Sequence, residues 1–156
     1  MPHERPRAFP ARRRLRRPDE FAAVLAARGP ASLRLARRWF AVSVLALPRG
    51  VSAAELDPVR FGFTVGKRNA RRAVDRNLVK RVLRESARHA FGQFATLAHE
   101  RGLGLAVSLR LKAPLVPKGA AVARGELSRA LRADCDALLT DLARHLPRLS
   151  LEATDA

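Results

Sequence analysis

One segment, from about Ala70 to Phe91, constrains the fold most, because its residues separate onto two halves of a helix. At about 100° per residue, one half is apolar and the other is basic. The apolar half holds Val74, Leu78, Val79, Val82 and Leu83, and the basic half holds Arg76, Asn77, Lys80, Arg81, Arg84 and Arg88. Such a helix packs its apolar half on a sheet and leaves its basic half open. We expect Asn69 to cap its first turn.

The basic half of this helix repels itself. Its like charges stand four residues apart, at Arg76, Lys80, Arg84 and Arg88, and each such pair costs roughly a few tenths of a kcal/mol. A solvated helix face is the alternative interpretation for a run of charges, but almost no acids are interspersed here. The pattern therefore favours a face that an anion neutralises.

The rest of the chain predicts two more helices and four strands. Pro18 and two acids begin a short helix that ends near Arg28, with Phe21, Val24 and Leu25 on one face. Alternating or apolar runs predict strands at 32–35, 40–47, 59–67 and 103–111, and the segment 126–145 predicts an amphipathic helix. This order of elements is that of an α+β, or α/β, sandwich. We expect a flexible basic arm at 1–13, one domain at 14–146 and a tail at 147–156.

The charge of the chain points to a nucleic-acid partner. Its 156 residues hold 31 Lys and Arg against 14 Asp and Glu, a formal net charge of +17. The excess lies in the first half of the chain, since the segment from Glu126 onward has more acids than arginines. Such an excess is typical of proteins that bind nucleic acid, with an anionic membrane surface as a distant second. No apolar run approaches the roughly 18–20 residues of a membrane span, and we expect a cytoplasmic protein without a membrane partner.

Catalytic and metal-binding motifs are scarce. The four histidines are scattered, and there is no phosphate-binding glycine loop and no motif for a serine or cysteine nucleophile. Asp134 and Asp136 point apart on a helix and are interpreted as surface acids, and Cys135 as a small core or surface residue. A protein nuclease needs clustered carboxylates for its metal ions. We therefore expect a protein that binds RNA or DNA and has neither a catalytic nor a metal site of its own.

The segment from Arg60 to Ser86 resembles the signature of the protein component of bacterial ribonuclease P. In that family a glycine-containing strand ends in two basic residues, here Lys67 and Arg68, and a helix with an Arg-Asn-Arg run follows. The matching helix residues are Arg76, Asn77, Lys80, Arg81, Arg84 and Glu85. Further matches upstream and downstream, at Phe9-Pro10, Leu15, Phe21, 40–47 and Val107–Arg110, extend the resemblance over about 9–145. Leu78 departs from it, because the family has the second arginine there, and Ser43 and Leu25 stand where many relatives have aromatic residues.

The resemblance implies a fold, a catalyst and partners. The family's fold is an αβββαβα sandwich with a four-stranded sheet and a left-handed βαβ crossover, like the second domain of ribosomal protein S5. Its catalyst is an RNA subunit, which uses magnesium ions (Mg2+) to hydrolyse the 5′ leader from precursor tRNA. The implied cofactors are thus the catalytic RNA and Mg2+ held mainly by that RNA. The implied partners are ribonuclease P RNA and the leader, with no obligate protein partner.

The resemblance also assigns site residues. Those implied to face the catalytic RNA are Lys67, Arg68, Arg72, Arg76, Asn77, Lys80, Arg81, Arg84 and Arg88. Those implied to line a leader cleft, between the first helix and the sheet, are Phe21, Phe40 and Ser43, with Lys67 and Arg68 near its rim. Core packing is the alternative for both phenylalanines. Two other functions stay open: a general RNA-binding structural protein, such as a ribosomal protein, and a nuclease that needs no RNA.

Overall fold

The computed structural model describes residues 9–49, 58–115 and 123–151, with a four-stranded sheet at its centre. The strands are β1 (Ser32–Ala36), β2 (Phe40–Pro48), β3 (Val59–Thr64) and β4 (Leu103–Leu111). The α-helices are α1 (Pro18–Ala26), α2 (Ala73–Arg101) and α3 (Arg124–His145), and two short 3-10 helices are η1 (Ala11–Arg13) and η2 (Leu146–Arg148). The predicted α+β arrangement of three helices and four strands is confirmed.

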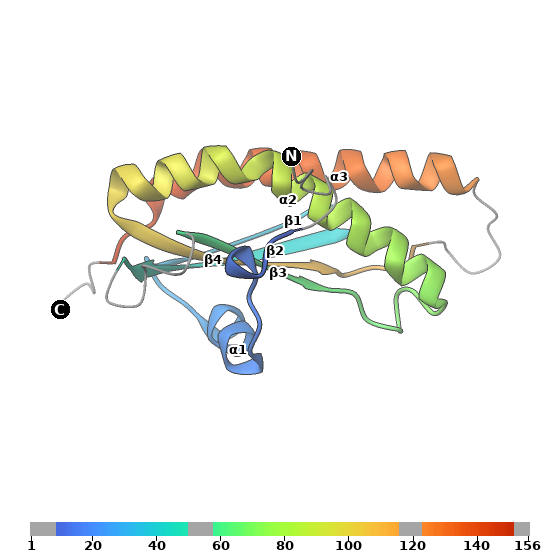
Figure 1. Cartoon of the computed structure of the whole chain (residues 1–156), viewed down its shortest axis with the longest axis horizontal. Helices are drawn as coiled ribbons and strands as arrows, with labels where there is room; N and C mark the ends of the chain where they lie inside the picture. Colours follow the sequence, from blue (N-terminus) through green and yellow to red (C-terminus); the bar gives the residue numbers. More distant parts are fainter. Residues whose placement is uncertain (1–8, 50–57, 116–122, 152–156) are drawn as a thin grey trace, which may run out of the picture.

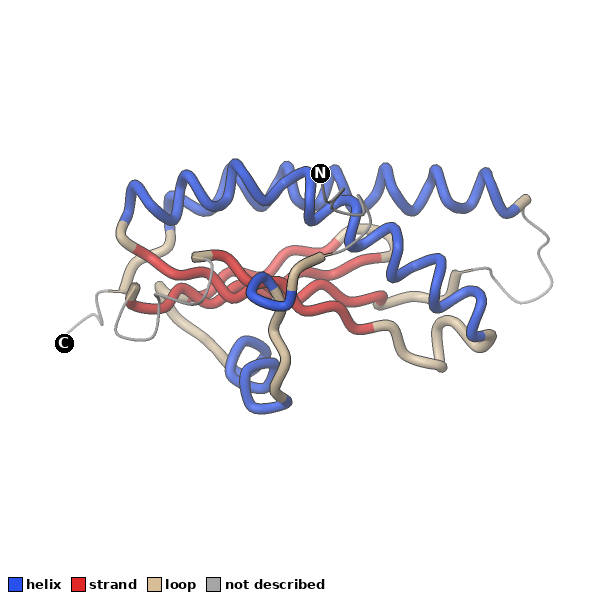
Figure 2. Tube along the Cα trace, viewed as in Figure 1, coloured by secondary structure: helices blue, strands red, loops and turns tan. Residues whose placement is uncertain are grey.

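The sheet has the strand order β1-β2-β4-β3. β2 pairs antiparallel with β1 and β4, whereas β3 pairs parallel with β4. A parallel pair needs a crossover connection, and α2 supplies it. α2 and α3 lie over one face of the sheet and α1 lies on the other (Figure 1). Figure 2 shows the strands as one layer between them. The hand of the crossover stays a prediction.

Most of the core lies between the sheet and the layer formed by α2 and α3. Alternate residues of each strand point into it, and Phe40 of β2 and Phe61 of β3 are both 0% exposed there. The ring of Phe61 lies at its centre, with the rings of Phe9, Phe63 and Phe94 at centroid distances of 5.8, 6.4 and 6.0 Å. Each large apolar side chain buried in this way stabilises the fold by about 1.5–3 kcal/mol.

α1 packs on the other face of the sheet through a smaller cluster. Its Phe21 lies against Gly62 of β3, where a Cβ atom would come within 2.3 Å of the Phe21 ring. Glycine is therefore required at this close approach. Val24 is buried in the same cluster, and Glu20 forms an ion pair with Arg60 of β3 at 2.5 Å.

α2 begins later than its pattern predicts. It starts at Ala73 rather than Ala70, and Asn69 is not its cap. The Nδ2 of Asn69 donates instead to the carbonyl of Leu111, at the end of β4, at 3.1 Å. The segment before the helix is thus a loop that is fastened to the sheet.

α2 also ends later than its pattern predicts. It continues past Phe91 to Arg101, because Phe94 and Ala98 keep its apolar side buried. Gly102 ends it with φ at 64°, a left-handed conformation that favours glycine, and its N–H donates to the last carbonyls of the helix.

The packed part of the chain is longer than the predicted domain. Phe9, in the predicted arm, is 3% exposed, and Leu149, in the predicted tail, is 0% exposed. Both belong to the main core, so the predicted boundaries after residues 13 and 146 move outward. Residues 1–8 and 152–156 lie outside the described residues. Two residues predicted on apolar helix faces, Val74 and Leu25, are 50% and 42% exposed instead.

Candidate nucleic-acid interface

The basic half of α2 is open to solvent along the first part of the helix. Asn77, Lys80 and Arg81 are exposed, and Arg84 and Arg88 are partly buried. We call the four cations among them the basic stripe. Within the described ranges, no acid forms an ion pair with any residue of the basic stripe. The stripe is therefore uncompensated, while the opposite half of the helix packs in the core.

Arg76 differs from the basic stripe, although the sequence pattern groups it with these cations. Its Nη1 donates to the carbonyls of Ala70 and Arg71, at 3.0 and 2.8 Å. Its guanidinium therefore braces the loop that leads into α2. Leu78, which stands in place of the family's second arginine, is 8% exposed and packs in the core.

The loop between β3 and α2 presents two more cations. Lys67 and Arg68 are exposed at a turn, which the N–H groups of Asn69 and Ala70 close on the carbonyl of Gly66 at 3.2 and 3.1 Å. The Asn69 side chain fastens this turn to the last residue of β4. Both cations thus project from a loop that is held at two points.

Arg72 belongs to an ion-pair cluster at the start of α2. Its side chain is 74% exposed, and its Nε donates to Asp75 at 3.0 Å. Asp75 also pairs with Arg124 of α3 at 3.1 Å. Burial alone would raise the pKa of Asp75, but the two guanidinium groups hold it below its ordinary value. The cluster therefore joins the first turn of α2 to the first turn of α3.

The N-terminal segment brings further arginines to the flank of α2 that carries the basic stripe. The segment runs along β3, at the edge of the sheet, where the N–H of Leu15 donates to the carbonyl of Phe61 at 2.9 Å. The guanidinium of Arg13 lies 3.7 Å from the centre of the Phe91 ring, which follows the stripe along the same side of α2. The five arginines between residues 12 and 17 therefore pass the sheet edge between α2 and α1 (Figure 1).

Two of the three residues predicted for the leader cleft lie on the α1 side of the sheet. Phe21 is partly buried over β3, and Ser43 is 8% exposed, paired in register with Arg34 and Ser108. Phe40 lies elsewhere, because the alternation of β2 turns it to the opposite face, where it is 0% exposed. The prediction that Phe40 lines a cleft beside α1 is therefore wrong, and its role is core packing.

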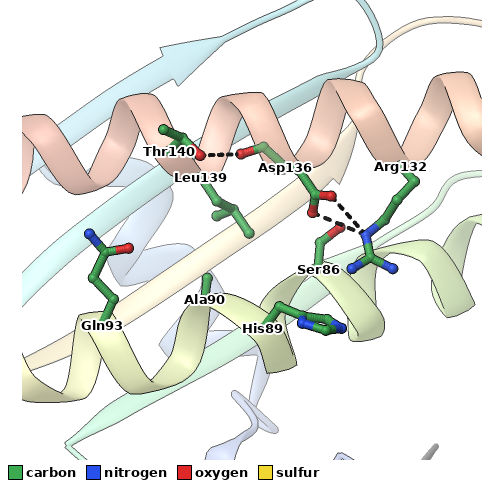
Figure 3. Close-up of a pocket in the computed structure, with 8 residues that line it drawn as sticks. All are labelled: Ser86, His89, Ala90, Gln93, Arg132, Asp136, Leu139 and Thr140. Carbon is green, nitrogen blue, oxygen red and sulfur yellow. Dashed lines mark hydrogen bonds and ion pairs between the residues drawn. The ribbon is translucent and has the colours of Figure 1, made fainter.

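Several acids of α2 and α3 pair with arginines outside the basic stripe. Arg132 of α3 pairs with Asp136 at 3.0 Å and with Glu85 of α2 at 3.1 Å, beside a groove of about 250 Å³ between the two helices (Figure 3). His89 lines this groove in the middle of α2. Asp134 is 8% exposed, so its interpretation as a surface acid is also wrong.

The described residues hold no cluster typical of a metal-dependent nuclease. In the ranges 9–49, 58–115 and 123–151, no three side chains of His, Cys, Asp or Glu gather to hold a metal ion. Burial raises the pKa of the Cys135 thiol to about 12, so the thiol is protonated at neutral pH and unreactive. No helix in the same ranges has the length and apolar character to cross a membrane.

Comparisons with known proteins agree with the resemblance in the sequence. Residues 9–113 match the ribonuclease P family. The ribonuclease P protein component of Bordetella parapertussis is 38% identical over 143 residues, which cover 89% of this chain and 99% of the relative. That of Paraburkholderia xenovorans is 34% identical over 150 residues, which cover 96% of this chain and 94% of the relative.

A solved structure is similar in fold. The Staphylococcus aureus RNase P protein has a TM-score of 0.53 at 19% identity, and the match covers 83% of this chain and 94% of that one. The sequence matches span most of the chain. The chain belongs to the ribonuclease P protein component family.

Proposed function

We propose that this chain is the protein subunit of ribonuclease P, the ribonucleoprotein that removes the 5′ leader from precursor tRNA. One observation carries the proposal: a band of positive charge along the β3 edge of the fold. The band consists of the basic stripe, the loop cations Lys67 and Arg68, and the arginines at 12–17. A fixed band without paired acids in the basic stripe or at the loop cations is suited to the phosphates of a folded RNA.

The basic stripe contacts the catalytic RNA in this proposal. Each phosphate that a lysine or arginine neutralises releases counterions. The logarithm of the affinity therefore falls linearly with the logarithm of the salt concentration, with a slope of roughly 0.9 per contact. Asn77 adds a hydrogen-bonding amide on the same half of the helix. Arg72 and Arg76 act mainly by holding the start of α2 in place, because the side chain of Arg72 pairs with Asp75 and that of Arg76 bonds to the carbonyl of Ala70.

The leader of the precursor lies on the α1 side of the sheet in this proposal. Phe21 is only partly buried, so part of its ring is open to a base, and base stacking on an aromatic ring is worth about 1–3 kcal/mol. Ser43 lies on the same face, at the middle of the sheet. Lys67 and Arg68 project from the end of β3, from where they reach phosphates of either RNA.

Hydrolysis takes place in the RNA subunit, which holds the Mg2+ ions. The described residues do not fit a metal ion, so no step is assigned to an ion on this chain. The protein instead reduces the repulsion between two RNA molecules, because its net charge of +17 replaces part of the screening that Mg2+ supplies. The complex works in the cytoplasm and needs no second protein.

The experiment that tests the proposal is cleavage of a precursor tRNA at low Mg2+. The protein alone, a folded bacterial ribonuclease P RNA alone, and both together are compared. We expect efficient cleavage at the mature 5′ end only with both. Cleavage by the protein alone would reveal an active site in this chain, and RNA binding without any gain in cleavage would leave a general RNA-binding structural protein.

Two variants of equal net charge distinguish the effect of the basic stripe from the effect of net charge alone. Replacing Lys80, Arg81 and Arg84 with alanine removes three cations from the stripe. The control replaces three exposed arginines outside the band, Arg129, Arg144 and Arg148, with alanine. We expect the stripe variant to lower the salt slope of assembly with the catalytic RNA by about two to three, with the control close to wild type. Equal losses in both variants would contradict the assignment of the stripe.

A further inference from the structure

A second basic surface lies at the turn between β1 and β2. β1 is the edge of the sheet opposite β3, so this turn lies across the sheet from the N-terminal arginines of the band, and it shares the end of β4 with the loop that carries Lys67 and Arg68. It consists of Arg37, Arg38 and Trp39. The guanidinium of Arg38 lies 4.1 Å from the centre of the Trp39 ring. The proposed function has assigned no role to these residues.

A buried carboxylate of α3 fixes the backbone of this turn. Asp134 accepts hydrogen bonds from the N–H groups of Arg38, Trp39 and Phe40, at 3.3, 3.0 and 3.3 Å. Arg37 pairs with Asp141, further along α3, at 3.2 Å. Charge-assisted bonds to backbone N–H groups are strong, so the backbone of the turn is held in place by α3. The stacked pair of Arg38 and Trp39 therefore stands on a fixed backbone.

Other cations lie beside the turn. The N–H of Lys112 donates to the carbonyl of Trp39 at 2.8 Å, which places Lys112 next to the stacked pair. Arg38 and Lys112 are exposed, and no acid of the described chain forms an ion pair with either side chain. The loop that carries Lys67 and Arg68 is fastened to the same end of β4. The turn therefore combines a planar stacked group with uncompensated positive charge.

We infer that Arg38, Trp39 and Lys112 bind one unpaired nucleotide of the precursor tRNA leader. Trp39 holds one face of the Arg38 guanidinium, and the base stacks on the other face, as bases do on guanidinium planes in RNA-binding proteins. Lys112 contacts the adjoining phosphate. The inference rests on the proposed function, since it assumes that a leader reaches this chain.

The position of the turn favours the leader over the catalytic RNA. Along β2, Ala41 lies between Ser43 and the turn, and it is paired in register with Arg110 of β4. Both residues share the α1 side of the sheet with Ser43, by the alternation of the strands. An RNA leader that crosses Ser43 and runs along β2 towards its start therefore passes Arg110 and then reaches the turn. The basic stripe, assigned to the catalytic RNA, lies on α2, which packs over the other face of the sheet (Figure 1).

The fluorescence of the chain reports on this turn directly. Trp39 is the one tryptophan, and the chain has no tyrosine. We would titrate the full-length protein with a single-stranded RNA pentanucleotide labelled for anisotropy, with a short RNA hairpin as the control. A saturable change in Trp39 emission is expected with the pentanucleotide and not with the hairpin. Saturated binding of the pentanucleotide without a change in emission would overturn the inference.

Substrates with leaders of different length locate the contact in the holoenzyme. Arg38→Ala and Lys112→Ala keep the backbone N–H groups that hold the turn, and Arg129→Ala removes an exposed arginine of α3 as the control. We expect each test variant to bind a long-leader precursor about 5- to 10-fold more weakly. Binding of tRNA without a leader and assembly with the catalytic RNA should stay unchanged.

The outcomes separate this inference from the proposed function. An equal loss with leaderless tRNA, or weaker assembly with the catalytic RNA, would place the turn against another RNA and overturn the inference. No loss with any leader would overturn it as well. A failure of the proposed function is different, because wild-type protein would then give no gain in cleavage with the catalytic RNA.

Discussion

Replacing Gly62 with alanine should push α1 away from the sheet. The added Cβ would lie 2.3 and 2.5 Å from two atoms of the Phe21 ring and 3.0 Å from a methyl group of Leu15. Ordinary contact between carbon atoms is about 3.5–4 Å, so the ring must move by more than 1 Å, roughly. Overpacking of this kind costs about 1–3 kcal/mol. We expect a loss of about 2 kcal/mol in the free energy of unfolding, which lowers Tm by about 4–8 °C for a chain of this size.

A double-mutant cycle tests the cause of that loss. Phe21→Ala alone should cost about 2–3 kcal/mol, below the full value for a buried phenylalanine, because the side chain is partly exposed. In the Phe21→Ala background the clash with the ring is absent and only the 3.0 Å contact with Leu15 remains, so Gly62→Ala should cost less than about 1 kcal/mol. Urea denaturation followed by circular dichroism measures all four proteins. If the two losses simply add, the contact between the ring and Gly62 does not determine how α1 is held.

Three other perturbations follow from single contacts. Burial alone would raise the pKa of Glu20, but the backbone N–H of Arg17 and the guanidinium of Arg60 hold it below 4.5. The ionised carboxylate therefore stabilises the fold fully above pH 4.5, and this stabilisation is lost on acidification. The urea midpoint of wild type should fall more below pH 4.5 than that of Glu20→Gln, and parallel pH profiles would contradict this. Asp134→Ala removes the acceptor of three N–H groups and should cost about 2–4 kcal/mol in urea denaturation, whereas a loss under 1 kcal/mol, roughly, would mean that water replaces the carboxylate. Asn69→Ala removes no charge but releases the loop that carries Lys67 and Arg68 from β4. It should weaken assembly with the catalytic RNA by a few fold, about 1 kcal/mol. Unchanged assembly would show that the loop needs no such support.

Local periodicity was enough to predict most of the elements. The apolar half of α2 and the strand at 103–111 follow from regular spacing, and both are borne out. The alternation of side chains along a strand also predicts that Phe40 does not line the cleft with Ser43. Residues 40 and 43 differ by an odd number, so a strand turns them to opposite faces, and they could not both line one cleft. The family resemblance places both residues in one cleft, but the alternation of β2 separates them.

The remaining errors concern contacts between distant parts of the chain. Asn69 has the right residue type for a helix cap, but its partner is a carbonyl of β4. Asp134 was expected on the surface because acids usually are, but three N–H groups of a turn nearly a hundred positions away compensate its burial. Phe9 was assigned to an arm because prolines and arginines surround it. Sequence spacing carries no information about such partners, and only the one aromatic residue in that arm, Phe9, indicated that it packs.

The strand order has a consequence for how the protein is made. β3 touches β2 nowhere in the sheet, because β4 lies between them. β4 is the last strand to be synthesised, so β3 has no partner in the sheet while the ribosome is still building α2. The N-terminal segment needs β3 in place, since Leu15 and Phe9 both pack against Phe61. Contacts so distant in sequence form late. We therefore expect the arginine-rich start of a nascent chain to stay unpacked until residue 111 has left the exit tunnel, after which β4 closes the sheet and α3, the last helix to emerge, completes the core.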